Sequence, residues 1–169
     1  MKKTSLIVIV CIGIIIFISF PWLYYRSMVN KASIGEPAKK NGEFPFKLVY
    51  RINDEVVTIE DTFICEYKGA KWNWNIGGYR VWKGYIESTG EDMVHVMNDG
   101  EYNIVITVGF AEYYMGLAPS SEYPWTPQFV KTGPQGSALG LSYEEALSQY
   151  GIEILSFEHT DPIGNIVSD

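Results

Sequence analysis

The sequence predicts a mainly β protein: an N-terminal transmembrane helix followed by one antiparallel β-rich domain with a short helix near the C-terminus. Three observations lead to this prediction: an apolar run from Leu6 to Leu23, an alternation of apolar and polar residues that begins at Phe46, and a helix-capping signal at Ser142. We expect a transmembrane segment over residues 1–26, a flexible tether over residues 27–43 and the β-rich domain over residues 44–169.

The apolar run is long enough to cross a bilayer. Its eighteen residues would form a helix of about 27 Å, close to the hydrocarbon thickness of a membrane. A cleaved signal peptide is the alternative, and it needs small residues beside the cleavage site. Ala32 suits the last position before a cut, but Asn30 stands where a second small residue is expected. Trp22 and Arg26, with two tyrosines between them, match the boundary of a retained span. The sequence therefore favours an anchor held in membrane lipid through Leu6 to Leu23.

The residues beside this run favour a single-pass protein of the plasma membrane with its C-terminal domain outside the cell. Lys2 and Lys3 favour a cytoplasmic amino end, and so short an N-terminal tail is typical of a signal-anchor. The opposite orientation is favoured by the basic residues after the run, Arg26, Lys31, Lys39 and Lys40. Cys65 is the only thiol beyond the run, so the domain cannot contain a disulfide. This supports a bacterial, Gram-positive envelope over a disulfide-rich secreted protein.

The tether has no regular spacing of hydrophobic residues, so no helix or strand is predicted there. The domain that follows it begins with a predicted hairpin. Its strands cover residues 46–52 and 56–59, and Asn53-Asp54 forms a two-residue turn because both residues tolerate a positive φ. Further strands are predicted over residues 62–67, ended by Gly69, and over residues 79–88. Residues 93–97 and 102–108 are expected to form a second hairpin around Asn98-Asp99-Gly100.

One segment has helical rather than strand periodicity. Ser142 and Glu145 form a capping box, and Gly151 is placed to end a helix, so we expect a helix over residues 143–150. A last strand is predicted over residues 152–157. Residues 113–140 are rich in Pro, Gly, Ser and aromatic residues and are expected to form a long irregular excursion, a kind of segment that is often functional.

Negative charge is concentrated in the second half of the chain. Residues 84–169 contain thirteen acidic residues and one basic residue, Lys131. This charge excludes nucleic acid and anionic polymers as partners, whereas a basic partner or simple solubility is compatible with it. The sequence predicts no cofactor and no metal site, since the Asn98–Glu101 turn lacks the spaced ligands of a calcium loop.

Two groups of aromatic residues are candidates for a binding surface. Exposed Trp and Tyr rings stack on sugars and act as anchors in protein recognition, whereas packing in the core is their alternative role. Trp82 and Tyr85 are expected in the core. We expect exposure, and a binding role, for Trp72 and Trp74, which precede Asn75 and Gly77, and for the residues of the excursion, Tyr113, Tyr114, Tyr123 and Trp125.

Catalytic motifs are scarce. Cys65 lies in a predicted strand, so we expect it to be buried and inert rather than a nucleophile paired with His95 or His159. His95 is expected on a solvent-facing side of its strand. No phosphate-binding loop or nucleophile elbow occurs. The remaining catalytic possibility is a pair of carboxylates from distant positions, for which Glu112, Glu122 and Asp92 are the candidates.

Four segments carry a resemblance to a known group of proteins. They are Phe44-Pro45-Phe46-Lys47-Leu48-Val49-Tyr50, residues 59–69 (IEDTFICEYKG), residues 79–86 (YRVWKGYI) and residues 111–116 (AEYYMG). Between Phe44 and Met115 the chain resembles uncharacterised small membrane-anchored proteins of Gram-positive, clostridia-like bacteria. The resemblance implies an envelope location and supplies neither an activity nor functional residues.

These observations favour a non-catalytic binding or structural module of the cell envelope, with an envelope protein or a glycan as its partner. One alternative is a carboxylate-dependent hydrolase of the cell envelope, which requires two acids within about 10 Å across a concave pocket. Another is an inhibitor or immunity-type protein whose acidic face contacts a basic partner.

Overall fold

The computed structural model describes residues 13, 15–17, 19–21, 35–73, 75, 77–116, 125–134 and 136–164. They belong to two compact units, one made of residues 1–35 and 69–81 and the other of residues 36–68 and 82–169. Most of the predicted transmembrane segment, Leu6 to Leu23, lies outside the described residues, and the part of it that is described is helical. Over the described ranges, no helix has both the length and the apolar character needed to cross a membrane.

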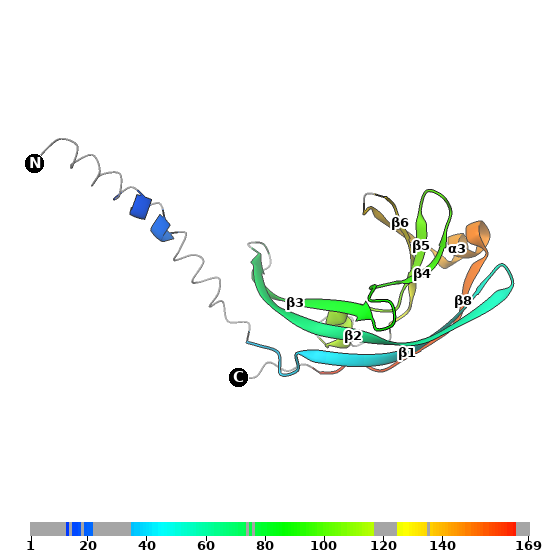
Figure 1. The fold of residues 1–169 in the computed structure, drawn as a ribbon, viewed down its shortest axis with the longest axis horizontal. Coiled ribbons are helices and arrows are strands. Elements are labelled where there is room, and N and C mark those ends of the chain that lie inside the picture. Colours follow the sequence, from blue (N-terminus) through cyan, green and yellow to red (C-terminus); the bar gives the residue numbers. More distant parts are fainter. Residues whose placement is uncertain are drawn as a thin grey trace, which may run out of the picture. The chain divides into compact units, whose positions relative to one another are not determined.

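Two four-stranded antiparallel sheets form most of the described structure (Figure 1). The first has the order β3-β2-β1-β8 and consists of β1 (Asn41–Ile52), β2 (Glu55–Asn73), β3 (Gly77–Ile86) and β8 (Ile152–His159). The second has the order β4-β5-β6-β7 and consists of β4 (Val94–Asn98), β5 (Asn103–Thr107), β6 (Gln128–Thr132) and β7 (Ala138–Leu141). The described elements also include two short helices, α2 (Ala111–Tyr114) and α3 (Tyr143–Tyr150). The prediction of a mainly β, antiparallel fold with a short helix near the C-terminus is confirmed.

The first hairpin follows from its alternating sequence. Along β1, buried Phe44, Phe46 and Leu48 alternate with more exposed residues, as expected for a strand with one face on a core. Asn53 (φ 48°) and Asp54 (φ 66°) form the predicted two-residue turn to β2. β1 begins at Asn41, so the last residues of the predicted tether belong to the sheet.

β2 is longer than the sequence suggested. The prediction of separate strands over residues 56–59 and 62–67 is wrong, because one strand runs through Glu60-Asp61 and continues past Gly69 to Asn73. Pairing explains the continuity: Glu60 lies opposite Lys47 of β1, and their side chains form an ion pair of 2.5 Å at the surface. Gly69 adopts a positive φ of 115° within the strand and does not end it.

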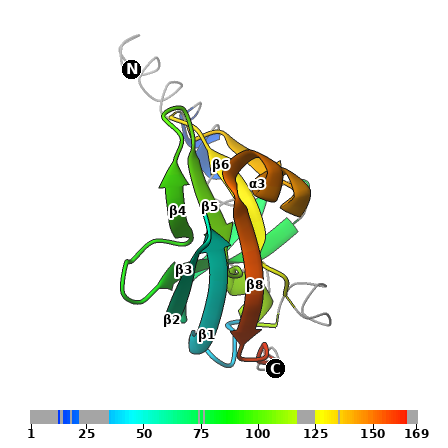
Figure 2. The same cartoon turned by 90° about the vertical axis from the view of Figure 1, so that its right-hand side faces the viewer.

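The last of the described strands pairs with β1. β8 runs antiparallel to β1, from the pair Ile52–Ile152 to the pair Phe46–His159, and α3 leads into it (Figure 2). The helix has the predicted bounds. The Ser142 hydroxyl accepts a hydrogen bond from the Glu145 amide, the Glu145 carboxylate accepts one from the Ser142 amide, and Gly151 ends the helix at φ 65°.

The capping box gives a first testable expectation. Replacing Ser142 with Ala removes the acceptor for the Glu145 amide and should lower the free energy of unfolding by about 1 kcal/mol. Urea denaturation followed by circular dichroism measures this change. A neighbouring exposed substitution, Ser148→Ala, is the control and should leave the unfolding midpoint in place; equal effects of the two substitutions would contradict the role of the cap.

In the second sheet, the predicted hairpin is confirmed, whereas two strands were not predicted. The hairpin around Asn98-Asp99-Gly100 is present, with Gly100 at φ 99° and the Asp99 carboxylate accepting hydrogen bonds from the amides of Glu101 and Tyr102. The long irregular excursion over residues 113–140 is only partly irregular, since it contains β6 and most of β7. These strands are short, and they are fixed by pairing with β5 and with each other rather than by a local pattern.

The hydrophobic core of the second unit is built from both sheets. Phe44, Phe46 and Leu48 of β1 share a cluster with Ile104 and Ile106 of β5, and all five are at most 4% exposed. Phe129 of β6 and the apolar residues of α2, Ala111, Tyr113 and Tyr114, belong to the same cluster. The two layers therefore stabilise each other through one core.

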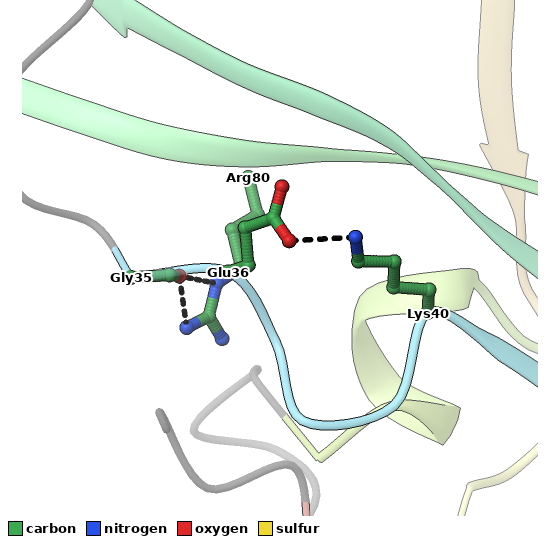
Figure 3. A network of polar contacts seen from close by, with 4 residues as sticks. All are labelled: Gly35, Glu36, Lys40 and Arg80. Carbon is green, nitrogen blue, oxygen red and sulfur yellow. Dashed lines mark hydrogen bonds and ion pairs between the residues drawn. The ribbon is translucent and has the colours of Figure 1, made fainter. Parts of the chain in front are cut away.

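The first unit contains the described helical residues and the outer ends of β2 and β3. Its Arg80 side chain donates two hydrogen bonds to the carbonyl oxygen of Gly35, at 3.2 Å from Nε and 2.8 Å from Nη2 (Figure 3). The same view shows an ion pair of the second unit, in which Lys40 lies 2.6 Å from Glu36. The hydrogen bonds from Arg80 hold the backbone at Gly35. The ion pair joins two side chains at the surface of the segment that precedes β1.

Candidate functional site

A cavity of about 250 Å³ opens between residues of the two sheets of the second unit. One wall comes from β2 and β3 and the other from β5, from the turn that leads into α2, and from the start of β6. The lining residues are mainly aromatic or small, and two of them are acidic: Phe63, Trp82, Gly84, Asp92, Met93, Thr107, Gly109, Phe110, Ala111, Glu112, Trp125 and Gln128. Basic residues are absent from this described lining.

The two acidic residues that line the cavity come from different elements. Asp92 follows a turn after β3 in which the Ile86 amide donates to the Glu91 carbonyl at 2.7 Å, and Glu112 lies in the first turn of α2. Neither side chain forms an ion pair or a hydrogen bond with the described part of the chain. Some other acids of this unit are paired, as in the Arg51–Glu153 contact of 2.5 Å. The carboxylates of Asp92 and Glu112 are therefore available to a ligand.

Two tryptophans that line the cavity have unsatisfied donors. The indole nitrogens of Trp82 and Trp125 are buried, and no hydrogen-bond acceptor for them occurs among the described residues. Trp82 is 8% exposed and lies against Tyr67, with ring centroids 5.3 Å apart. An unpaired buried donor costs about 1–3 kcal/mol, so an acceptor that reached either nitrogen would be favourable, although both nitrogens are shielded from solvent.

The rim of the cavity is formed by a corner of aromatic rings. Trp125 meets Phe110 edge to face, with centroids 5.0 Å apart and an interplanar angle of 77°. The Trp125 amide donates to the Tyr113 hydroxyl at 2.9 Å, which fixes the backbone at this point. Phe110 is 37% exposed, so this corner is open to solvent.

The predicted aromatic binding surface is only partly supported. The expected exposure of Tyr113 and Tyr114 is wrong: they are 1% and 0% exposed, because α2 turns both rings into the core. Trp125 is partly exposed at the cavity, and Trp72 is partly exposed on β2 in the first unit. Trp74 and Tyr123 lie outside the described residues. A binding role for Trp72, Trp74, Tyr123 and Trp125 stays a prediction.

Of the acidic candidates, the fold brings two together. Asp92 and Glu112 line the same cavity, whereas Glu122 lies outside the described residues. Phe63 and Phe110 were missed by sequence reasoning. The only local signal for Phe110 is its position between a glycine and a helix start, and Phe63 looks like any other core residue of a strand.

The thiol and imidazole groups do not form a catalytic pair. Cys65 is fully buried, and burial, helped by the nearby Glu112 carboxylate, raises its pKa to about 12. The His95 side chain is exposed, as predicted, and His159 stands at the end of β8 with its ring 5.2 Å from that of Phe157. No group of three or more potential metal ligands occurs in the described ranges.

The burial of Cys65 predicts low chemical reactivity. In a Cys11→Ser chain, a disulfide reagent such as DTNB should modify Cys65 at least about 100-fold more slowly at pH 8 than it modifies a free cysteine, because the thiolate is both inaccessible and scarce. Adding denaturant should restore the full rate. Rapid labelling of the folded chain would show that the thiol is accessible and contradict this account.

A second depression is wider and more open. It has a volume of about 610 Å³ and lies over β1, β2 and the end of β8. Two of its acids already have partners, since Glu60 pairs with Lys47 and Asp61 accepts a hydrogen bond from Ser88. The cavity between the sheets is thus the better candidate site.

Comparison with known proteins adds no relative. No protein family, curated protein or solved structure matches this chain.

Proposed function

We propose that this chain is a single-pass membrane protein of a bacterial envelope whose β-rich domain lies outside the cell and acts as a non-catalytic binding module. The resemblance of residues 44–115 to small anchored proteins of Gram-positive bacteria favours this location. The cavity lined by Asp92, Glu112 and aromatic rings is its binding site.

The anchor is supported by the apolar run and by its exposed side chains. Among the described helical residues, Ile15, Ile16, Phe17 and Phe20 are between 59% and 81% exposed. Large apolar residues exposed side by side are unfavourable in water and favourable in lipid. Leu6 to Leu23 would then be the membrane-spanning segment.

The binding role is carried by one observation: two carboxylates without partners among the described residues line an aromatic cavity. Apolar concave sites with a few converging polar groups are typical of ligand pockets.

A carboxylate-dependent hydrolase of the envelope is the second candidate. It is favoured by the same pair, because Asp92 and Glu112 come from separate elements to one concave site, as an acid and a base or nucleophile would. Binding has fewer structural requirements than hydrolysis, because it does not need a particular distance between the two carboxyl groups.

Two measurements test the proposal. In Gram-positive cells that express the full chain, external protease should remove the domain, and the remainder should stay in the membrane after a carbonate wash. Recovery of a soluble protein that begins near Ser33 would overturn the anchor.

The second measurement tests the binding site. Purified full chain should sediment with washed cell-wall sacculi, and an Asp92→Asn/Glu112→Gln double variant should not. Equal sedimentation of the two would overturn the assignment of the site. Release of reducing ends from the sacculi would favour the hydrolase.

A further inference from the structure

We propose that the cavity binds a single saccharide ring through Asp92, Glu112 and the indoles of Trp82 and Trp125. This inference rests on the proposed function and names the ligand class of its site. The volume of about 250 Å³ lies just below the range of pockets for drug-sized ligands, so one ring fits better than a long oligomer.

The aromatic walls suit the apolar faces of a sugar. Trp125 and Phe110 meet at 77° and form a corner, and Phe63 of β2 and Trp82 of β3, which are 1% and 8% exposed, lie behind the cavity wall. The C–H faces of a pyranose pack on such rings and are removed from water.

The carboxylates suit its hydroxyl groups. Ionised Asp and Glu side chains only accept hydrogen bonds, and a hydroxyl that donates to a carboxylate forms a charge-assisted bond. Asp92 and Glu112 have no competing donor among the described residues, and the described lining contains no basic residue that would neutralise them.

The indole groups decide between a sugar and an organic cation. A small ammonium ion would also be attracted by carboxylates and aromatic faces, but it has no acceptor for an indole N–H. Hydroxyl oxygens both donate and accept, so one sugar can bond to the carboxylates and to the unpaired donors of Trp82 and Trp125. Both indole nitrogens are buried, so each ring has to turn before its N–H can meet a bound hydroxyl.

The test uses the full chain in polyoxyethylene ether micelles, because these detergents carry neither sugar nor ammonium headgroups. Glucose, galactose and N-acetylglucosamine are titrated separately, and binding is followed by tryptophan fluorescence and by saturation-transfer NMR of the ligand. At least one sugar should bind saturably with a Kd of about 1–10 mM. Asp92→Asn and Glu112→Gln should each weaken this binding about tenfold. Trp125→Phe, which keeps a ring and removes the N–H, should weaken it about threefold to tenfold.

Glu144→Gln is the matched control, because it makes the same chemical change as Glu112→Gln on the exposed face of α3. It should leave the Kd unchanged, and thermal unfolding should confirm that every variant is folded. Tetramethylammonium is the competing probe. If no sugar binds saturably, whether or not tetramethylammonium does, the saccharide proposal is overturned. Sedimentation with sacculi tests the proposed function separately. Sugar binding that is insensitive to all three cavity variants would overturn the site.

Discussion

The Tyr114→Ala variant is expected to lose about 3–5 kcal/mol of unfolding free energy, which is a large part of the stability of a domain of this size. Tyr114 is fully buried, and its ring stacks on Phe44 with centroids 4.6 Å apart and lies 5.3 Å from the ring of Phe63. Its hydroxyl donates a 2.8 Å hydrogen bond to the Val108 carbonyl. Truncation would remove the ring, leave a cavity and leave that carbonyl unpaired.

Urea denaturation of the full chain in micelles measures this loss, and two further variants separate its causes. Tyr114→Phe keeps the ring and removes only the hydroxyl, so it should cost about 1–3 kcal/mol. Tyr79→Ala makes the same truncation at a residue that is 38% exposed and should cost less than about 1 kcal/mol. If Tyr114→Ala were no more destabilising than Tyr79→Ala, the buried position of this ring would be wrong.

The Gly116→Ala variant should have the second largest effect, a loss of about 2–4 kcal/mol. Gly116 has a φ of 68°, and a Cβ at this position would lie 2.0 Å from the carbonyl oxygen of Ile163. The contact is with backbone, so it cannot be relieved by a side-chain rotation. The backbones would have to separate, which would break the 2.8 Å hydrogen bond from the Ile163 amide to the Tyr114 carbonyl.

Gly90→Ala provides a matched control. Gly90 has a similar φ of 74°, but an added Cβ has no neighbour within 4 Å. This variant should cost only the conformational penalty of about 1–2 kcal/mol. Chemical denaturation of the pair isolates the effect of the close approach, and equal losses would show that residue 163 does not lie against Gly116.

Local signals in the sequence were sufficient for several elements. The Asn53-Asp54 turn and the Ser142 capping box each place specific side chains or permissive residues at the positions that the backbone requires. Neither depends on the rest of the fold. Such elements can be predicted residue by residue.

Other elements depend on contacts that no local pattern encodes. β6 exists because it pairs with β5, and β2 runs through two adjacent acids because a lysine of β1 faces one of them. Tyr113 and Tyr114 have the composition of an exposed aromatic group, yet a single helical turn directs both into the core. The same reasoning applies to the candidate site: Asp92 and Glu112 could be named as acids, but only the tertiary structure brings them to one cavity.

The pairing of β1 with β8 has a consequence for the order of events during biosynthesis. β1 acquires its second neighbour only after Ile152–His159 has left the ribosome, since β8 follows every other described strand in the sequence. One flank of β1 in the nascent polypeptide therefore stays uncovered until β8 has been synthesised. A stop codon placed before β8 would be expected to leave a sheet open to proteolysis or to association with other chains.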